Sequence, residues 1–121
     1  MTEEQVIHIE QTLGIELPSE YKQIITNYPS LLISTDAQDF GLLNNPHEII
    51  AQNRFVLENG ACGGKWPSQY FIIGINGAGD YYVIKHAENK FSVGFANHET
   101  ASIELYARNL DEFIAKLFAE I

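Results

Sequence analysis

The sequence has 121 residues, of which 45% are hydrophobic, with sixteen acidic and seven basic side chains, a net charge of −9 and a single cysteine. This length and hydrophobic content predict one domain over residues 1–121 that buries a core without a disulfide framework. The charge argues against nucleic-acid binding, which requires clustered Lys and Arg. The acidic N-terminus does not resemble a signal peptide, and the longest apolar stretch, Tyr70–Ile75, is too short to span a membrane. We therefore expect a cytoplasmic protein.

The acidic residues are concentrated in the first half of the chain. Residues 1–60 carry nine acids and two bases, whereas residues 61–121 carry seven acids and five bases. Excess acid keeps a small domain soluble. It also forms a negative surface that steers a cationic protein partner. Composition leaves both interpretations open.

Two helices are predicted at the start of the chain. Thr2 and Gln5 have the spacing of a capping box, and apolar residues follow at helical intervals until Gly14, which suits a helix end. The second helix is predicted to have Pro18 in its first turn, where a missing N–H costs nothing, and to stop at Pro29.

An ordered loop is predicted over residues 29–43, followed by a third helix with Asn45 as its cap and Pro46 in its first turn. Asn53 interrupts the apolar stripe of this helix. The three glycines within residues 58–65 predict a loop. The residues predicted to form the buried side of the third helix are Ile49, Ile50, Val56 and Leu57.

The second half of the sequence changes to a strand pattern. The predicted strands are residues 70–75, 80–85, 91–95 and 102–106, the first central and the last at an edge. Asn109 caps the final predicted helix, with Glu112 at the capping-box position. The order of elements predicts an α+β fold, in which an antiparallel sheet packs against N-terminal helices and a C-terminal helix.

The glycines at 74, 77 and 79 do not form a phosphate-binding loop, because their spacing differs and a strand follows instead of a helix. A structural hairpin is the better interpretation. Asp80, His86 and His98 would meet near strand ends if they bound a metal, yet no pair has the spacing of a known metal site. Cys62 has no local support as a nucleophile. We expect no catalytic residue, no metal and no cofactor.

Two aromatic or charged features have alternative interpretations. Trp66 is the only tryptophan, and it either fills the end of the core or anchors an interface, where Trp is enriched. The pair His98–Glu99 either stabilises a turn or lies on the rim of an interaction surface.

Several motifs together resemble the SUKH superfamily, which includes bacterial immunity proteins and a yeast cell-wall assembly regulator. Each motif is weak alone, but their order and spacing agree over residues 3–118. The sequence departs from the family pattern at Pro29-Ser30, where Asn-Gly-Gly is common, and at Asn109, where Ser is common. The matching segments are residues 13–21 (LGIELPSEY), Trp66 with residues 71–74 (FIIG), residues 76–82 (NGAGDYY), His98-Glu99 and residues 106–113 (YARNLDEF).

The resemblance implies a non-enzymatic domain that binds a bacterial toxin and neutralises it. Many members of the superfamily bind the C-terminal effector of a toxin, often a nuclease. A nuclease presents a basic cleft to its substrate, and an acidic inhibitor is attracted to that cleft. The alternative implied by the yeast relative is a regulatory scaffold that recruits cellular proteins.

Candidate contact residues follow from charge and loop position, not from any known site of the superfamily. They are acids expected in loops or at helix ends, with the tryptophan as a further anchor: Asp36, Asp39, Glu58, Glu99 and Trp66. The sequence does not identify the toxin or the oligomeric state.

Overall fold

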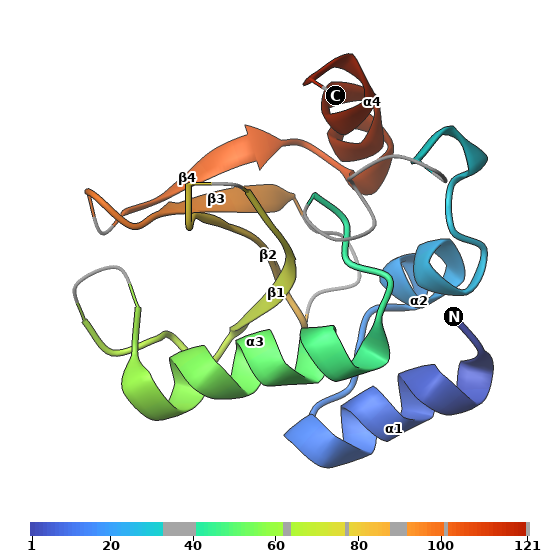
Figure 1. Cartoon of the computed structure of the whole chain (residues 1–121), viewed down its shortest axis with the longest axis horizontal. Coiled ribbons are helices and arrows are strands. Elements are labelled where there is room, and N and C mark those ends of the chain that lie inside the picture. The colour runs from blue at the N-terminus through green and yellow to red at the C-terminus, as the bar shows by residue number, and fades with distance from the viewer. Residues whose placement is uncertain (33–40, 62–63, 77, 88–91, 101, 121) are drawn as a thin grey trace.

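The fold is α+β, as predicted, with four α-helices and a four-stranded antiparallel sheet (Figure 1). The computed structural model describes residues 1–32, 41–61, 64–76, 78–87, 92–100 and 102–120, with the backbone alone at Leu31 and Glu120. The elements in chain order are α1 (Glu3–Leu13), α2 (Ser19–Thr26), the short 3-10 helix η1 (Ser30–Leu32), α3 (Pro46–Asn59), β1 (Tyr70–Ile75), β2 (Tyr81–Lys85), β3 (Val93–Asn97), β4 (Ser102–Ala107) and α4 (Leu110–Glu120).

The predicted helix caps at the first and third helices are confirmed. Thr2 and Gln5 exchange hydrogen bonds between side chain and backbone, at 2.9 and 3.1 Å, and complete the capping box of α1. Gly14 ends α1 with a φ of 68°, a left-handed conformation that glycine adopts without steric cost. The Asn45 side chain accepts a hydrogen bond from the Glu48 backbone N–H and caps α3. Local sequence therefore determines where these helices begin.

Three helix boundaries differ from the prediction. Pro18 precedes α2 as its N-cap residue and is not in its first turn. α2 ends at Thr26, before Pro29, because Asn27 leaves the helical conformation, with a φ of −122° and a ψ of 62°. Pro29 also disfavours a helical conformation at Tyr28. α3 extends to Asn59, so the predicted loop over residues 58–65 begins two residues too early.

The strands form one sheet in the order β1-β2-β3-β4, with antiparallel neighbours. The register shifts between Ile72 and Gly74 in β1, and between Val93 and Gly94 in β3. The first strand has the predicted bounds, but it lies at an edge of the sheet and not at the predicted central position. Its outer side bonds to Asn53 and Leu43 instead of to another strand. β3 begins two residues later than predicted, and Phe91 lies outside the described residues.

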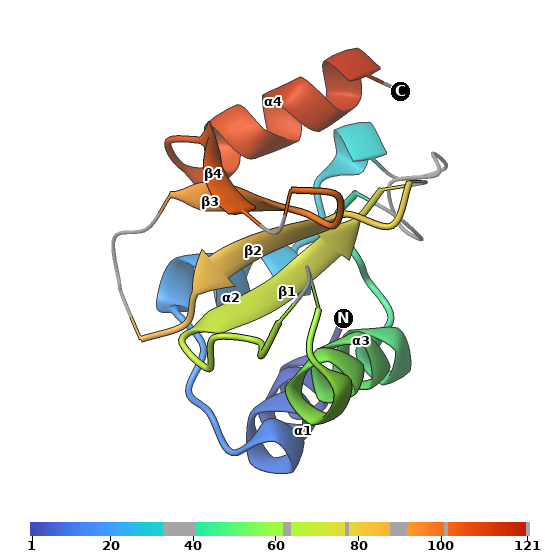
Figure 2. The same ribbon diagram turned by 90° about the vertical axis from the view of Figure 1, so that its left-hand side faces the viewer.

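Apolar side chains lie on both faces of the sheet. α1, α2 and α4 contribute to the larger cluster, on the face of Phe71, Ile73, Tyr82 and Ile84. A smaller cluster on the other face combines Val56 of α3 with Trp66, Ile72, Val83 and Ala96. Figures 1 and 2 show α4 at the β4 end of the sheet, and α1 and α3 side by side at the β1 end.

The predicted buried side of α3 is wrong at Leu57. Ile49 and Val56 are fully buried, but Leu57 is 50% exposed. With 3.6 residues per turn, Leu57 lies about 80° around the helix from Ile49. Its side chain therefore lies beside the buried side of α3 and not within it. The polar residue Asn53, which interrupts the predicted stripe, lies at the centre of the buried side and is 4% exposed.

Asn53 seals the outer edge of β1. Its amide oxygen accepts from the Ile72 N–H at 2.8 Å, and its amide nitrogen donates to the Ile72 carbonyl at 3.1 Å and to the Ile49 carbonyl at 2.9 Å. The side chain thus replaces the backbone of a neighbouring strand. The Leu43 N–H donates to Ile73 O at 3.0 Å and extends the seal.

α4 lies at the other end of the sheet. The Asn109 side chain caps it through the Glu112 N–H at 2.8 Å, as predicted, whereas the Glu112 carboxylate accepts from Arg108 instead of completing a capping box. Leu110, Phe113 and Leu117 form its buried stripe. No helix among the described residues is both long and apolar enough to cross a lipid bilayer.

We expect Asn53→Ala to lower the free energy of unfolding by about 2 kcal/mol or more, because the buried N–H and C=O of Ile72 lose their partners. Urea unfolding of wild type, Asn53→Ala and Gln52→Ala would measure this loss. Gln52 lies next to Asn53 on α3 but bonds to the Glu48 side chain. Equal stability of the two variants would contradict the proposed role of Asn53.

The two phenylalanines of α4 provide a second test of the packing. Phe113 is fully buried and packs on Tyr82 and Tyr106, whereas Phe118 is 51% exposed. We expect Phe113→Ala to cost roughly 3–5 kcal/mol through an internal cavity, and Phe118→Ala to cost much less. Thermal unfolding of both variants compares the two positions on one helix, and similar losses would show that the buried face of α4 is misassigned.

Candidate functional site

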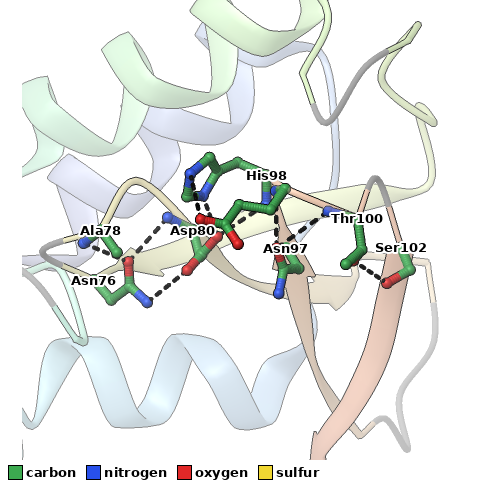
Figure 3. Close-up of polar contacts among 8 residues, drawn as sticks. Asn76, Ala78, Asp80, Asn97, His98, Thr100 and Ser102 are labelled. Carbon is green, nitrogen blue, oxygen red and sulfur yellow. Dashed lines mark hydrogen bonds and ion pairs between the residues drawn. The ribbon is translucent and has the colours of Figure 1, made fainter.

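The turns that follow β1 and β3 are joined by a cluster of polar side chains (Figure 3). In the first turn, the Asn76 side-chain oxygen accepts from the N–H groups of Ala78 and Asp80, each at 2.9 Å. The Asn76 side-chain nitrogen donates to Asp80 Oδ2 at 3.0 Å. Gly79 has a φ of 90°, so this glycine serves a hairpin turn, as predicted.

Asp80 connects this turn to the turn between β3 and β4. Its Oδ1 accepts from the His98 backbone N–H at 2.9 Å and lies 2.5 Å from His98 Nδ1. Asp80 is 7% exposed, whereas the His98 side chain is 43% exposed. One carboxylate therefore joins two turns that are eighteen residues apart in the sequence.

The pKa of Asp80 reflects two opposing effects. Burial penalises the ionised carboxylate and by itself raises the pKa. The hydrogen bonds from the His98 backbone, the Asn76 side chain and the His98 side chain, together with the charge of His98, lower it. The net result is a pKa of Asp80 below its ordinary value. The cluster is thus built around an ionised carboxylate.

Asn97 shapes the second turn in the same way as Asn76 shapes the first. Its side-chain oxygen accepts from the N–H groups of Glu99 and Thr100, at 2.8 and 3.3 Å. The hydroxyls of Thr100 and Ser102 are 2.7 Å apart. Glu99 Oε1 lies 4.0 Å from His98 Nε2, and the Glu99 side chain is 77% exposed. The cluster therefore holds Glu99 outward at the tip of the turn.

Of the three residues considered as metal ligands, the structure brings two together. Asp80 and His98 are in contact, but His86 Nε2 is instead 2.9 Å from Ser68 O. Within the described ranges, no three His, Cys, Asp or Glu side chains form a group that could hold a metal ion. The contacts between Asp80 and His98 join the two turns, so His98 acts as a turn stabiliser.

The position of Trp66 agrees with the first of its two interpretations. Trp66 is 4% exposed, packs edge-on against Tyr81 at 5.8 Å between ring centroids, and donates from Nε1 to Tyr70 O at 3.2 Å. It fills the core between α3 and the sheet. A surface anchor at this position has no support from its burial.

The acidic candidates lie at separate places. Glu58 is exposed in the last turn of α3, and Glu99 is exposed between β3 and β4. Asp36 and Asp39 lie outside the described residues, as does Cys62.

Sequence reasoning did not identify Asn76 and Asn97 as the residues that shape the two turns. The available signal is an asparagine at the end of a strand, where a turn begins, since its side chain readily binds N–H groups that follow within a few residues. The contact of Asp80 with His98 had no such local signal.

We expect the stability contributed by Asp80 to depend on pH. Because the pKa of Asp80 is lowered in the fold, its ionised form stabilises the protein above about pH 4, and this contribution is lost as the pH falls through the lowered value. Asp80→Asn should reduce the free energy of unfolding by about 1–3 kcal/mol at pH 7 and by less at acid pH.

Urea unfolding of wild type and Asp80→Asn between neutral and strongly acid pH would measure this difference. Glu104→Gln is the control, because Glu104 is exposed on β4. A difference between wild type and Asp80→Asn that stays constant with pH would show that ionisation of Asp80 is not the source of the stability.

Comparison with known proteins gives one clear relationship. Residues 1–116 match the model of the SMI1 / KNR4 family (SUKH-1). Searches of curated proteins and of solved structures gave no significant match. The match covers nearly the whole chain and agrees with the resemblance in the motifs, so the chain belongs to the SMI1 / KNR4 family, SUKH-1, within the SUKH superfamily.

Proposed function

We propose that this protein is an immunity protein that binds a cognate bacterial toxin and neutralises it by occlusion, without catalysis by this chain. Membership of a family that includes toxin immunity proteins supports the general class. The observation that favours a basic toxin is the excess of acidic over basic side chains.

Seven basic side chains cannot pair one to one with sixteen acidic side chains. Ion pairs between described residues include those of Lys22 with Glu10 and of Arg108 with Glu112. A surface with this excess attracts a cationic partner over distances of about one Debye length. The described acids that are exposed are Glu3, Glu4, Glu16, Glu20, Glu58, Glu99, Glu104 and Asp111.

A nuclease effector is the toxin class that fits this surface best. Such an enzyme must bind phosphates, so its cleft is basic, and an acidic protein that covers the cleft excludes the substrate. Occlusion needs a well-packed interface of about 1,600 Å² and no reacting group on the inhibitor. We include Asp36, Asp39, Glu58 and Glu99 as candidate acids that steer the encounter.

The proposal is tested with the product of the gene that lies next to the gene of this protein. Its C-terminal effector domain would be co-expressed with the protein, and complex formation and cell survival would be measured. A one-to-one complex that abolishes toxicity is the expected result. Several weak partners that dissociate at high salt would instead indicate a regulatory scaffold, and survival without a complex would contradict occlusion.

We expect Glu58→Lys/Glu99→Lys to slow association with the effector by about tenfold at low salt and to weaken the salt dependence of the association rate. The control is Glu104→Lys/Asp111→Lys, which changes the net charge by the same amount at two other exposed acids. Stopped-flow association at several salt concentrations gives both quantities. Equal rates for the two double variants would mean that net charge, and not the position of Glu58 and Glu99, controls the encounter.

A further inference from the structure

An open groove runs along the helical hairpin of α1 and α2. It consists of three adjoining hollows of about 350, 410 and 500 Å³. The first and second hollows share Glu10 and Lys22, and the second and third share residues 14–16. Each hollow therefore borders the next at the lining residues that they share, and the middle one is shallow.

The first hollow lies between the two helices, and Val6 and Ile7 are its apolar lining residues among polar and charged ones. Val6 and Ile7 of α1 face Ser19, Gln23 and Thr26 of α2 across it. Val6 is buried, but Ile7 is 50% exposed. A partner that covers Ile7 removes apolar area from water, which favours association.

The charges along this groove are almost all negative. Glu3, Glu10 and Glu16 line it, together with Lys22 and, in the third hollow, His86. Lys22 Nζ lies 3.6 Å from Glu10 Oε2, so its charge is directed to a carboxylate of the groove itself. Glu4 and Glu20 are exposed on the same two helices and add to the negative charge.

The acids of the hairpin differ in what they do for the fold. Glu3, Glu4 and Glu20 lie in first turns of helices, where a negative charge also stabilises the helix N-terminus. Glu10 accepts a hydrogen bond from the Leu17 N–H at 2.7 Å and supports the loop between the helices. Glu16 is exposed, precedes α2, and has neither of these roles. The acid at Glu16 is therefore available to a ligand.

We propose that the groove of α1 and α2 docks a cationic, amphipathic protein segment, and that this segment belongs to the toxin. An apolar side chain of the segment lies on Ile7, and its Lys or Arg side chains face Glu3 and Glu16. The identification of the segment with the toxin rests on the proposed function. The groove itself requires only this combination of charge and apolar surface.

Charge selects this occupant over the alternatives. A second copy of the chain would bring another net charge of −9 and the same row of acids to the groove. A nucleic acid would bring phosphates to the acids. A cationic segment with an apolar side complements both the rim and the floor of the groove.

The test compares two double variants with equal changes in charge. Ile7→Ser/Glu16→Lys alters the groove, and Leu57→Ser/Glu104→Lys makes the same kind of change on α3 and β4. Ile7 and Leu57 are each 50% exposed, and Glu16 and Glu104 are both exposed, so both variants should fold. Circular dichroism and thermal unfolding would verify this.

Two probes are measured against wild type and both variants. The first is the effector domain of the neighbouring toxin, and the second is a short amphipathic peptide of leucine and lysine, with a leucine–glutamate peptide as its control. We expect both cationic probes to bind the groove variant about tenfold more weakly than wild type, and the α3–β4 variant with nearly unchanged affinity. The glutamate peptide should not bind.

The outcomes distinguish the groove from the proposed function. Tight effector binding that the groove variant retains would overturn the groove as the toxin site and leave the immunity function intact. No effector binding by wild type would overturn the toxin proposal, and the lysine peptide would then decide whether the groove docks cationic segments. Equal losses in both variants would show that net charge alone governs binding and would overturn the inference.

Discussion

The edge of β1 is the constraint on which the arrangement of this fold depends. An unpaired strand edge leaves backbone donors and acceptors without partners, and in a buried location each of them is costly. Asn53 satisfies both groups of Ile72 with one side chain, and the same amide bonds the Ile49 carbonyl on its own helix. The position and the orientation of α3 relative to the sheet are therefore fixed. As a result, Val56 and Trp66 pack with Ile72 in the smaller apolar cluster.

Asp80 has a comparable part at the turns, where it joins two segments of the chain. Among the described residues, Asn53 and Asp80 are the polar side chains classed as buried. Each binds backbone groups of a segment distant in sequence, Ile72 in one case and His98 in the other. Side-chain oxygens thus replace backbone pairing where the sheet ends, and the turn that carries Glu99 is held by the same frame as the core.

Interactions between residues close together in the sequence can be predicted, whereas those between distant residues cannot. The caps formed by Thr2 and Asn45 involve partners three residues away, so their residue types predict them directly. Asn53 was visible as an interruption in an apolar stripe, but its partner is nineteen residues further along the chain, and no local pattern indicates it. The prediction that Leu57 is buried is wrong for a related reason. The position of the sheet decides which side of α3 is buried, and the sequence of α3 alone does not show it. The groove of α1 and α2 could not be predicted from the sequence, because it depends on how the two helices pack against each other.

The internal use of charge explains why the acids of the surface remain available to a partner. Lys22 and Arg108 are each directed to a carboxylate, and Lys116 donates to the Tyr106 carbonyl at 2.5 Å while lying over the Tyr106 ring. The positive charges of these residues stabilise local packing, whereas Glu16, Glu58 and Glu99 make no comparable contact with a Lys or Arg in the described structure. A substitution at one of these three acids would therefore change the electrostatic field with little effect on the buried frame. The exposed acids are thus separate from the residues that hold the fold together. Substitutions at these acids can change binding specificity while Asn53 and Asp80 maintain the fold.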